Sequence, residues 1–183
     1  MSVIDTYLTS EAEVLRQMPR APLERASSIL RQARSEGRCI FIFGNGGSAA
    51  TASHFVNDVI KGTLDARKPR MKIICLNDNM ATLTAFANDV GYDAVFAEPL
   101  VSLANEGDVA IAISGSGNSP NVLRAMVAAR ERKLTTIGFT GFSGGKLKDL
   151  VDVPVIVPST SMQLIEDAHV VLLHAVFMDI CAS

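Results

Sequence analysis

The chain has 183 residues, of which 48% are hydrophobic and 20% charged, so it has the size and composition of one globular domain. The formal net charge is −2, and we expect no direct nucleic-acid partner. The three cysteines, Cys39, Cys75 and Cys181, show no paired spacing, which is typical of a reducing compartment. No apolar run reaches the roughly 18 residues of a membrane span, and the first 20 residues carry acids. We therefore expect a cytoplasmic protein that has no membrane partner.

The N-terminal segment predicts two amphipathic helices that are broken at Pro19–Pro22. They span Val3–Gln17 and Pro22–Glu36. We expect residues 1–37 to pack on the core or on a neighbouring subunit.

The middle of the chain alternates between short apolar runs and helical patterns. The runs are rich in β-branched residues and nearly continuous in hydrophobicity, as in strands buried on both faces of a parallel sheet. The predicted strands are Cys39–Phe43, Lys72–Leu76, Val109–Ile113, Thr135–Phe139 and Val153–Val157. The predicted helices between them are Ala49–Ile60, Ala81–Ala87, Asp93–Leu103, Asn121–Lys133 and a short one near Gly145–Leu150. This alternation predicts an α/β fold: a doubly wound, three-layer α/β/α sandwich around a five-stranded parallel sheet.

The C-terminal segment, from about Met162 to Cys181, predicts one long helix that is apolar on most faces. Both a subunit contact and burial within the monomer would explain this character. Since no linker or repeat interrupts the sequence, we expect residues 1–183 to form one domain.

Two loops rich in glycine and serine follow predicted strands and precede predicted helices. The first is Gly44-Asn45-Gly46-Gly47-Ser48, and the second is Ser114-Gly115-Ser116-Gly117-Asn118-Ser119. Glycine allows close backbone approach, a helix N-terminus attracts anions, and serine hydroxyls donate to phosphate oxygens. The alternative is that these residues only form turns and helix caps. Neither loop fits a dinucleotide or ATP motif, so we expect a monophosphate on a small molecule and no nucleotide cofactor.

These two loop sequences resemble the signatures of the sugar isomerase (SIS) domain family. Within that family the chain is similar to the phosphoheptose isomerase branch along nearly its whole length. The resemblance implies a homotetramer whose sites lie between subunits. It also implies substrate contacts at Asn45, Gly46, Gly47, Ser48, Asn88, Asp89, Ser114, Gly115, Ser116 and Ser119. The family usually has Thr at the position of Gly115, where only a backbone contact would survive.

Two predicted helices carry a possible metal or acid–base cluster. His54 and Asp58 are four residues apart and face the same side of one helix, while Glu166 and His174 lie on the C-terminal helix. Two histidines and two carboxylates are a suitable ligand set for Zn²⁺ or another divalent metal. A solvated helix face and a core histidine would explain the same residues without a metal. The four positions match the family's zinc ligands, although Asp58 stands where the family has Glu and Glu166 where it usually has Gln.

The resemblance implies an aldose–ketose isomerase, most simply one that converts sedoheptulose 7-phosphate to D-glycero-manno-heptose 7-phosphate. Such a reaction needs a base near carbon and an acid near oxygen. We assign the base to Asp58 or Glu166 and the acid to His174. The alternative function is a non-catalytic SIS-domain protein that binds a sugar phosphate or a protein partner, such as the replication-initiator-associating type.

Overall fold

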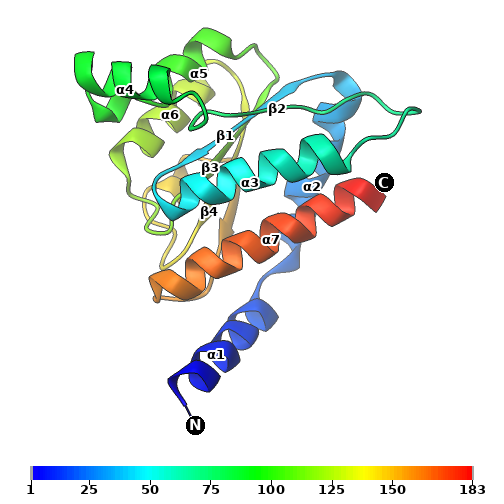
Figure 1. The fold of residues 1–183 in the computed structure, drawn as a ribbon, viewed down its shortest axis with the longest axis vertical. Helices are drawn as coiled ribbons and strands as arrows, with labels where there is room; N and C mark the ends of the chain where they lie inside the picture. The colour runs from blue at the N-terminus through cyan, green and yellow to red at the C-terminus, as the bar shows by residue number, and fades with distance from the viewer. Residues whose placement is uncertain (1, 183) are drawn as a thin grey trace.

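The computed structural model describes residues 2–182 and has a five-stranded parallel sheet between two layers of helices (Figure 1). The strands are β1 (Cys39–Gly44), β2 (Lys72–Cys75), β3 (Val109–Ile113), β4 (Thr135–Thr140) and β5 (Val153–Ile156). Their order in the sheet is β2-β1-β3-β4-β5, and every pairing is parallel. The predicted fold class is confirmed, and each strand lies within one residue of its predicted ends.

The sheet is buried on both faces, which explains the continuous apolar runs. In β1, Ile40 and Ile42 belong to one hydrophobic core, whereas Phe41 and Phe43 belong to the core on the other side. All four residues are at most 1% exposed. Because successive strand residues point to opposite faces, a strand covered on both sides must be apolar at every position.

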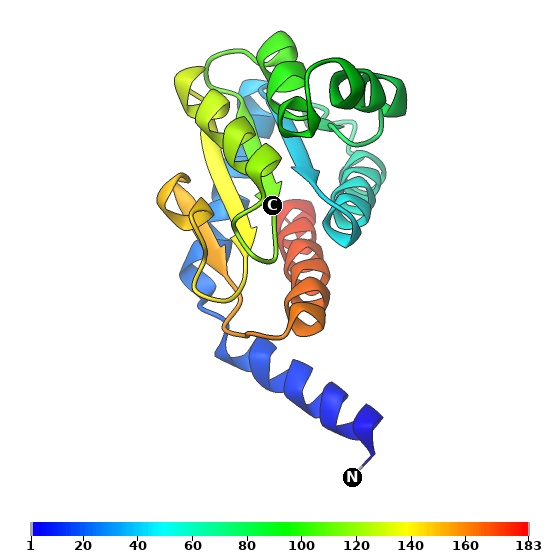
Figure 2. The ribbon, with the colours of Figure 1, turned by 90° about the vertical axis from the view of Figure 1, so that its left-hand side faces the viewer.

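One face of the sheet is covered by α2 (Arg20–Glu36), α3 (Gly47–Gly62) and α7 (Met162–Ala182). The other face is covered by α5 (Ala97–Leu103), α6 (Pro120–Glu131) and the short η1 (Tyr92–Ala94) and η2 (Leu147–Asp149), with α4 (Met80–Asp89) at its edge. Helix α1 (Val3–Gln17) projects from this body and packs mainly on α7 (Figure 2). Within residues 2–182, no helix combines the length and apolar character needed to cross a bilayer.

Two helix predictions were wrong in extent. The segment predicted as one helix over Asp93–Leu103 is divided between η1 and α5. Because proline lacks an N–H and clashes with the preceding turn, it is tolerated only in the first turn of a helix, and α5 begins two residues before Pro99. The helix predicted near Gly145–Leu150 is the single turn η2.

Helix α7 buries one side against the sheet and its neighbouring helices, where seven of its 21 residues are buried, among them Leu172, Leu173 and Val176. Its large hydrophobic residues Met162, Val171 and Met178 lie elsewhere on the helix and are 37%, 44% and 63% exposed. Burial in the monomer therefore explains one side of this helix, while its exposed apolar residues are left for a contact outside the chain.

His169 is a buried residue of α7 at the end of β4. Its Nε2 lies 3.2 Å from the carbonyl oxygen of Thr140, and its ring meets Phe139 edge to face. Burial lowers the pKa of His169 from 6.5 to about 4, because the charged ring would lose its hydration. The ring is therefore neutral in the folded protein near pH 7.

We predict that His169 makes the protein acid-sensitive. Since its folded pKa lies below its unfolded value, its contribution is complete above pH 6.5 and declines as pH falls toward 4. The shift corresponds to a loss of roughly 3 kcal/mol across this window, at about 1.4 kcal/mol per unit. Urea unfolding of the wild type and of His169→Gln at several pH values measures it. The difference in free energy of unfolding between wild type and His169→Gln should become smaller as pH falls. A difference that stays constant with pH would contradict the assignment.

Candidate active site

The two glycine- and serine-rich loops meet at the carboxyl ends of β1 and β3. These strands are neighbours, but β1 leads to α3 on one face of the sheet and β3 leads to α6 on the other. Such a reversal is the place where open α/β sheets bind ligands. A Cβ atom on Gly44 would lie 2.7 Å from the carbonyl oxygen of Ile113, so the two strand ends are closer than any side chain would allow.

The loops enclose a hollow of about 150 Å³. It is lined by polar loop residues together with Ile113 and two residues of α7. The predicted substrate residues in its lining are Asn45, Ser48, Ser114, Gly115, Ser116 and Ser119, and the α7 residues are Met162 and Glu166. The structure thus brings both predicted loops to one site.

The helices that follow the loops begin without a side-chain cap. The N-cap residues are Gly46 for α3 and Ser119 for α6, and neither makes a side-chain capping hydrogen bond. Helix α4, in contrast, is capped by Asn79, which accepts from the N–H of Thr82. Ser119 Oγ lies instead 3.3 Å from Ser114 Oγ, across the hollow's lining. Helix capping therefore does not explain these loops. The N–H groups of Gly47 and Ser48 at the start of α3 remain available to an anion. Helix α6 begins with Pro120, which has no N–H, and offers the N–H of Asn121, because that of Val122 is donated to Asn121 Oδ1.

The predicted contacts at Gly46 and Gly47 depend on backbone geometry. Gly46 has a φ of +54°, a conformation that side chains rarely adopt. A Cβ atom on Gly47 would lie 3.3 Å from Glu166 Oε2, so the glycine lets the start of α3 approach this carboxylate.

Gly115 has its carbonyl group turned into the protein. The oxygen accepts from the N–H of Gly141 at 2.9 Å. A Cβ atom on Gly115 would lie 2.5 Å from Met162 Sδ, so Met162 occupies the space that a larger residue would need. The absence of a side chain at this position is thus matched by a side chain from α7.

Asn88 and Asp89 lie just beyond the helix predicted over Ala81–Ala87, but in the structure they are the last two residues of α4. Both are exposed and bond to each other, with Asn88 Nδ2 donating to Asp89 Oδ1 at 2.7 Å. Neither lines the hollow. Within a single chain, Asn88 and Asp89 do not reach the two loops, so their contact with substrate stays a prediction.

His54, Asp58 and His174 form a second part of the site, between α3 and α7. His54 Nε2 and His174 Nε2 lie 3.4 Å and 3.2 Å from Asp58 Oδ2. The three ligand-type atoms are all within 4.8 Å of one another. The two histidine side chains are about half exposed, and that of Asp58 is 21% exposed. A compact set of two imidazoles and one carboxylate fits the three protein ligands of a catalytic zinc site.

Glu166, the fourth predicted ligand, lies apart from this cluster and lines the loop hollow. Helices α3 and α7 run side by side in the same direction, since Glu166 lies beside Gly47 while His174 lies beside Asp58 (Figure 1). Eight residues separate Glu166 from His174, or about 12 Å along a helix. The site therefore has two parts: a hollow at the helix N-termini and a His–Asp cluster two turns further along.

Several residues of the site gave no recognisable signal in the sequence. Asn77 brackets Gly44, because its Nδ2 donates to the carbonyl of Gly44 and its Oδ1 accepts the N–H. Asn121 exchanges two hydrogen bonds with Asn45, and the hydroxyl of Tyr92 also donates to Asn45. Each acts on another site residue through tertiary contact, which spacing in the sequence does not reveal.

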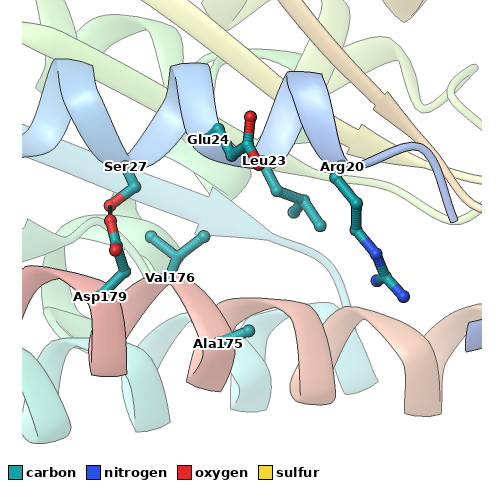
Figure 3. Close-up of a pocket in the computed structure, with 7 residues that line it drawn as sticks. All are labelled: Arg20, Leu23, Glu24, Ser27, Ala175, Val176 and Asp179. Atoms are coloured by element: carbon teal, nitrogen blue, oxygen red, sulfur yellow. Dashed lines mark hydrogen bonds between the residues drawn. The ribbon is translucent and has the colours of Figure 1, made fainter.

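A separate groove of about 210 Å³ lies between α2 and α7 (Figure 3). Leu23, Ala175 and Val176 supply its apolar walls, and Ser27 and Asp179 join across one end. It contains none of the predicted site residues.

The comparisons with known proteins agree with this geometry. The model of the SIS domain family matches residues 6–141. Phosphoheptose isomerases from Geobacter sulfurreducens and Aliarcobacter butzleri are 38% and 40% identical to the chain, over 94% and 96% of it and 93% of each relative. The solved phosphoheptose isomerase from Neisseria gonorrhoeae has a TM-score of 0.91 and 31% identity, and the match covers 98% of this chain and 97% of that one.

The chain therefore belongs to the SIS domain family. The relatives of similar length are aldose–ketose isomerases of the phosphoheptose type, and the loop sequences that carried the resemblance are those that form the hollow.

We predict that Gly115 and Met162 are energetically coupled. Gly115→Ala alone should destabilise the protein by roughly 1–3 kcal/mol, because the new methyl group overlaps Met162 Sδ. Met162→Ala should cost little, since Met162 is 37% exposed, and it should relieve most of the strain in the double variant. Urea unfolding of the four proteins measures this coupling. If the changes in free energy of unfolding of the two single variants add up to that of the double variant, the methyl group added at position 115 and Met162 do not compete for space.

Proposed function

We propose that this chain is an aldose–ketose isomerase that converts sedoheptulose 7-phosphate to D-glycero-manno-heptose 7-phosphate. The observation that carries the proposal is the alignment of α3 and α7, which places an anion-binding hollow and a His–Asp cluster on one line. The names of the relatives support the same reaction.

The separation of the two parts favours a long sugar. Three backbone bonds span about 3.3–3.6 Å, so the eight bonds from phosphorus to C1 in an extended seven-carbon chain span about 9 Å. The six bonds in a five-carbon sugar span only about 7 Å by the same measure. The hollow and the His–Asp cluster are about 12 Å apart along α7, and side chains at both ends extend into that distance. The seven-carbon sugar phosphate therefore spans it more readily than the five-carbon one.

The serine side of the hollow binds the phosphate in this proposal. Ser114, Ser116 and Ser119 offer hydroxyl donors, and the uncapped start of α3 offers backbone N–H groups. The start of α6 adds the N–H that follows Pro120. Glu166 also lines the hollow, and its carboxylate repels phosphate. The phosphate therefore lies away from Glu166, which faces the hydroxyl groups of the sugar.

The cluster residues supply the proton transfers. Isomerisation moves a proton between C1 and C2 through an enediol, so it needs a base at carbon and a donor at oxygen. Asp58 acts as the base and His174 as the opposing acid, and Asp58 Oδ2 and His174 Nε2 lie 3.2 Å apart on the open side of α3 and α7. With a metal held by these two atoms, the protons would be accepted by Asp58 Oδ1 and donated by His174 Nδ1. Glu166 takes the role of base if the shorter Asp58 side chain does not reach the carbon.

Zinc is the metal that we propose for this cluster, with His54, Asp58 and His174 as ligands. Glu166 would complete the set as a fourth ligand only by turning its side chain from the hollow toward the cluster, two turns further along α7. A bound divalent ion would polarise the carbonyl and hydroxyl oxygens of the substrate.

We predict that the purified protein turns over sedoheptulose 7-phosphate faster than five- and six-carbon ketose phosphates. His174→Gln should lower kcat by at least about 100-fold, because general acid catalysis contributes 10²–10⁴. Its affinity for inorganic phosphate should stay within twofold of the wild type. An NMR assay of product with added zinc measures turnover, and undiminished turnover in His174→Gln would contradict its role.

Metal content is measured on the same preparations after zinc addition and dialysis. Wild type should retain close to one equivalent, whereas His54→Gln should retain much less because one ligand is lost. Equal zinc in both proteins would show that the metal binds elsewhere, and no zinc in wild type would remove it from the proposal.

A homotetramer with sites between subunits, in the cytoplasm, completes the proposal, in which residues 1–183 act as one domain. Val3, Ile4 and Leu8 on projecting α1 are 87%, 71% and 62% exposed, so this helix carries an apolar face with no cover from its own chain. Sedimentation equilibrium should give four times 19.5 kDa. Ile4→Asp with Leu8→Asp should shift the mass downward, and a monomeric wild type would contradict the assembly.

The non-catalytic alternative is not favoured. A binding protein needs the hollow, but it does not need two histidines that converge on one carboxylate.

A further inference from the structure

The side chain of Asn45 is held by a chain of hydrogen bonds that begins at a backbone group. The N–H of Val122 donates to Asn121 Oδ1 at 3.0 Å. Asn121 Oδ1 also accepts from Asn45 Nδ2 at 2.9 Å, and Asn121 Nδ2 donates to Asn45 Oδ1 at 2.8 Å. The hydroxyl of Tyr92 donates to the same oxygen of Asn45 at 3.1 Å.

This series of hydrogen bonds determines the orientation of both amide groups. Two amides facing each other would bond equally well if both were reversed. The N–H of Val122 removes that freedom, because only the oxygen of Asn121 can accept from it. The hydroxyl of Tyr92 adds a third hydrogen bond to Asn45, at its oxygen. Because a hydroxyl can both donate and accept, the direction of the amides is set by the N–H of Val122. Asn121 is 2% exposed, so water does not compete for its bonds.

The bonding capacity of Asn45 is then almost fully used. Its oxygen accepts two hydrogen bonds, from Asn121 and Tyr92, and one Nδ2–H is donated to Asn121. The second Nδ2–H has no acceptor among residues 2–182, and Asn45 lines the hollow. The one hydrogen-bonding group of the Asn45 side chain that is not used within residues 2–182 is therefore an N–H donor.

Tyr92 is itself fixed to the element that carries Asn121. The next residue, Asp93, accepts a hydrogen bond from Arg124 of α6 at 2.9 Å. Tyr92 follows the end of α4 by three residues, so the same contact also fixes the distance of Asn88 and Asp89 from the first loop.

We propose that Tyr92 and Asn121 are positioning residues, which hold Asn45 as an N–H donor to a phosphate oxygen in the hollow. The inference rests on the proposed phosphate site, and it adds two residues that do not line the hollow. Losing Tyr92's hydroxyl removes one of the three hydrogen bonds that hold Asn45 and leaves the two to Asn121, so the oriented donor to an anion is weakened for substrate and transition state alike.

The test is Tyr92→Phe, which removes one oxygen from a residue that is 55% exposed and should leave folding intact. The matched control is Ser102→Ala in α5, whose hydroxyl bonds only to the carbonyl of Glu98 in its own helix. Calorimetric titration with inorganic phosphate should show a Kd about five- to tenfold weaker for Tyr92→Phe and unchanged for Ser102→Ala. With sedoheptulose 7-phosphate, KM should rise by a similar factor while kcat stays within twofold.

Asn121→Asp tests the direction of the bonds. The carboxylate keeps both acceptor roles of Asn121 but has no hydrogen to donate to Asn45 Oδ1, so phosphate affinity should fall at least as much as in Tyr92→Phe. Thermal unfolding shows whether the Asn121→Asp variant is folded. If it is not, the result for Tyr92→Phe decides whether the positioning role holds.

The outcomes separate this inference from the proposed function. Unchanged Kd and KM in Tyr92→Phe would overturn the positioning role while leaving the isomerase intact, as would a lower kcat at constant KM. Phosphate binding that Tyr92→Phe weakens, in a wild type that turns over no sugar phosphate, would support the inference and reject the isomerase. A wild type that binds no phosphate would overturn both.

Discussion

The site depends on the close approach of β1 and β3 at their carboxyl ends. Gly44 meets the carbonyl of Ile113 at a separation that no side chain would permit, and Asn77 holds both backbone groups of that glycine. Because the chain leaves these neighbouring strands toward opposite faces of the sheet, the two loops open side by side and the starts of α3 and α6 point into one hollow. A wider separation would leave two unrelated turns.

The second constraint is the parallel packing of α3 and α7. One helix follows the first loop directly, while the other comes from the far end of the chain, and their alignment carries the site from the hollow to the His–Asp cluster. Glycine at position 47 and Met162 opposite Gly115 show how closely the helix surfaces meet at the loop end. Further along, apolar side chains such as Phe55 and Leu173 pack between the helices, and on the open side of this contact Asp58 lies between two histidines.

The fold was predictable because burial on both faces makes each strand apolar throughout, and the two loops were predictable because their composition is unusual for ordinary turns. The pairing of His54 with Asp58 followed from helical periodicity. The division of the segment after Gly91 was also accessible, since Pro99 restricts where a helix can begin. What the sequence did not show was distance between segments: that Glu166 lies with the loops, that Asn88 and Asp89 end a helix away from them, and that Asn121 and Tyr92 reach Asn45. Those relations depend on how helices cross the sheet.

The uncapped starts of α3 and α6 also affect the energetics of the empty protein. A side-chain cap typically contributes about 1 kcal/mol to a helix, and α1 and α4 both have one. Helices α3 and α6 lack that contribution, so the proposed phosphate-binding region is also a region of lower local stability. The anion that we propose for the hollow would take the place of the missing cap of α3 and would accept the N–H that follows Pro120 at the start of α6. Selection for a more rigid resting state would therefore act against the property that makes the hollow a binding site, a conflict between stability and activity located in two helical turns.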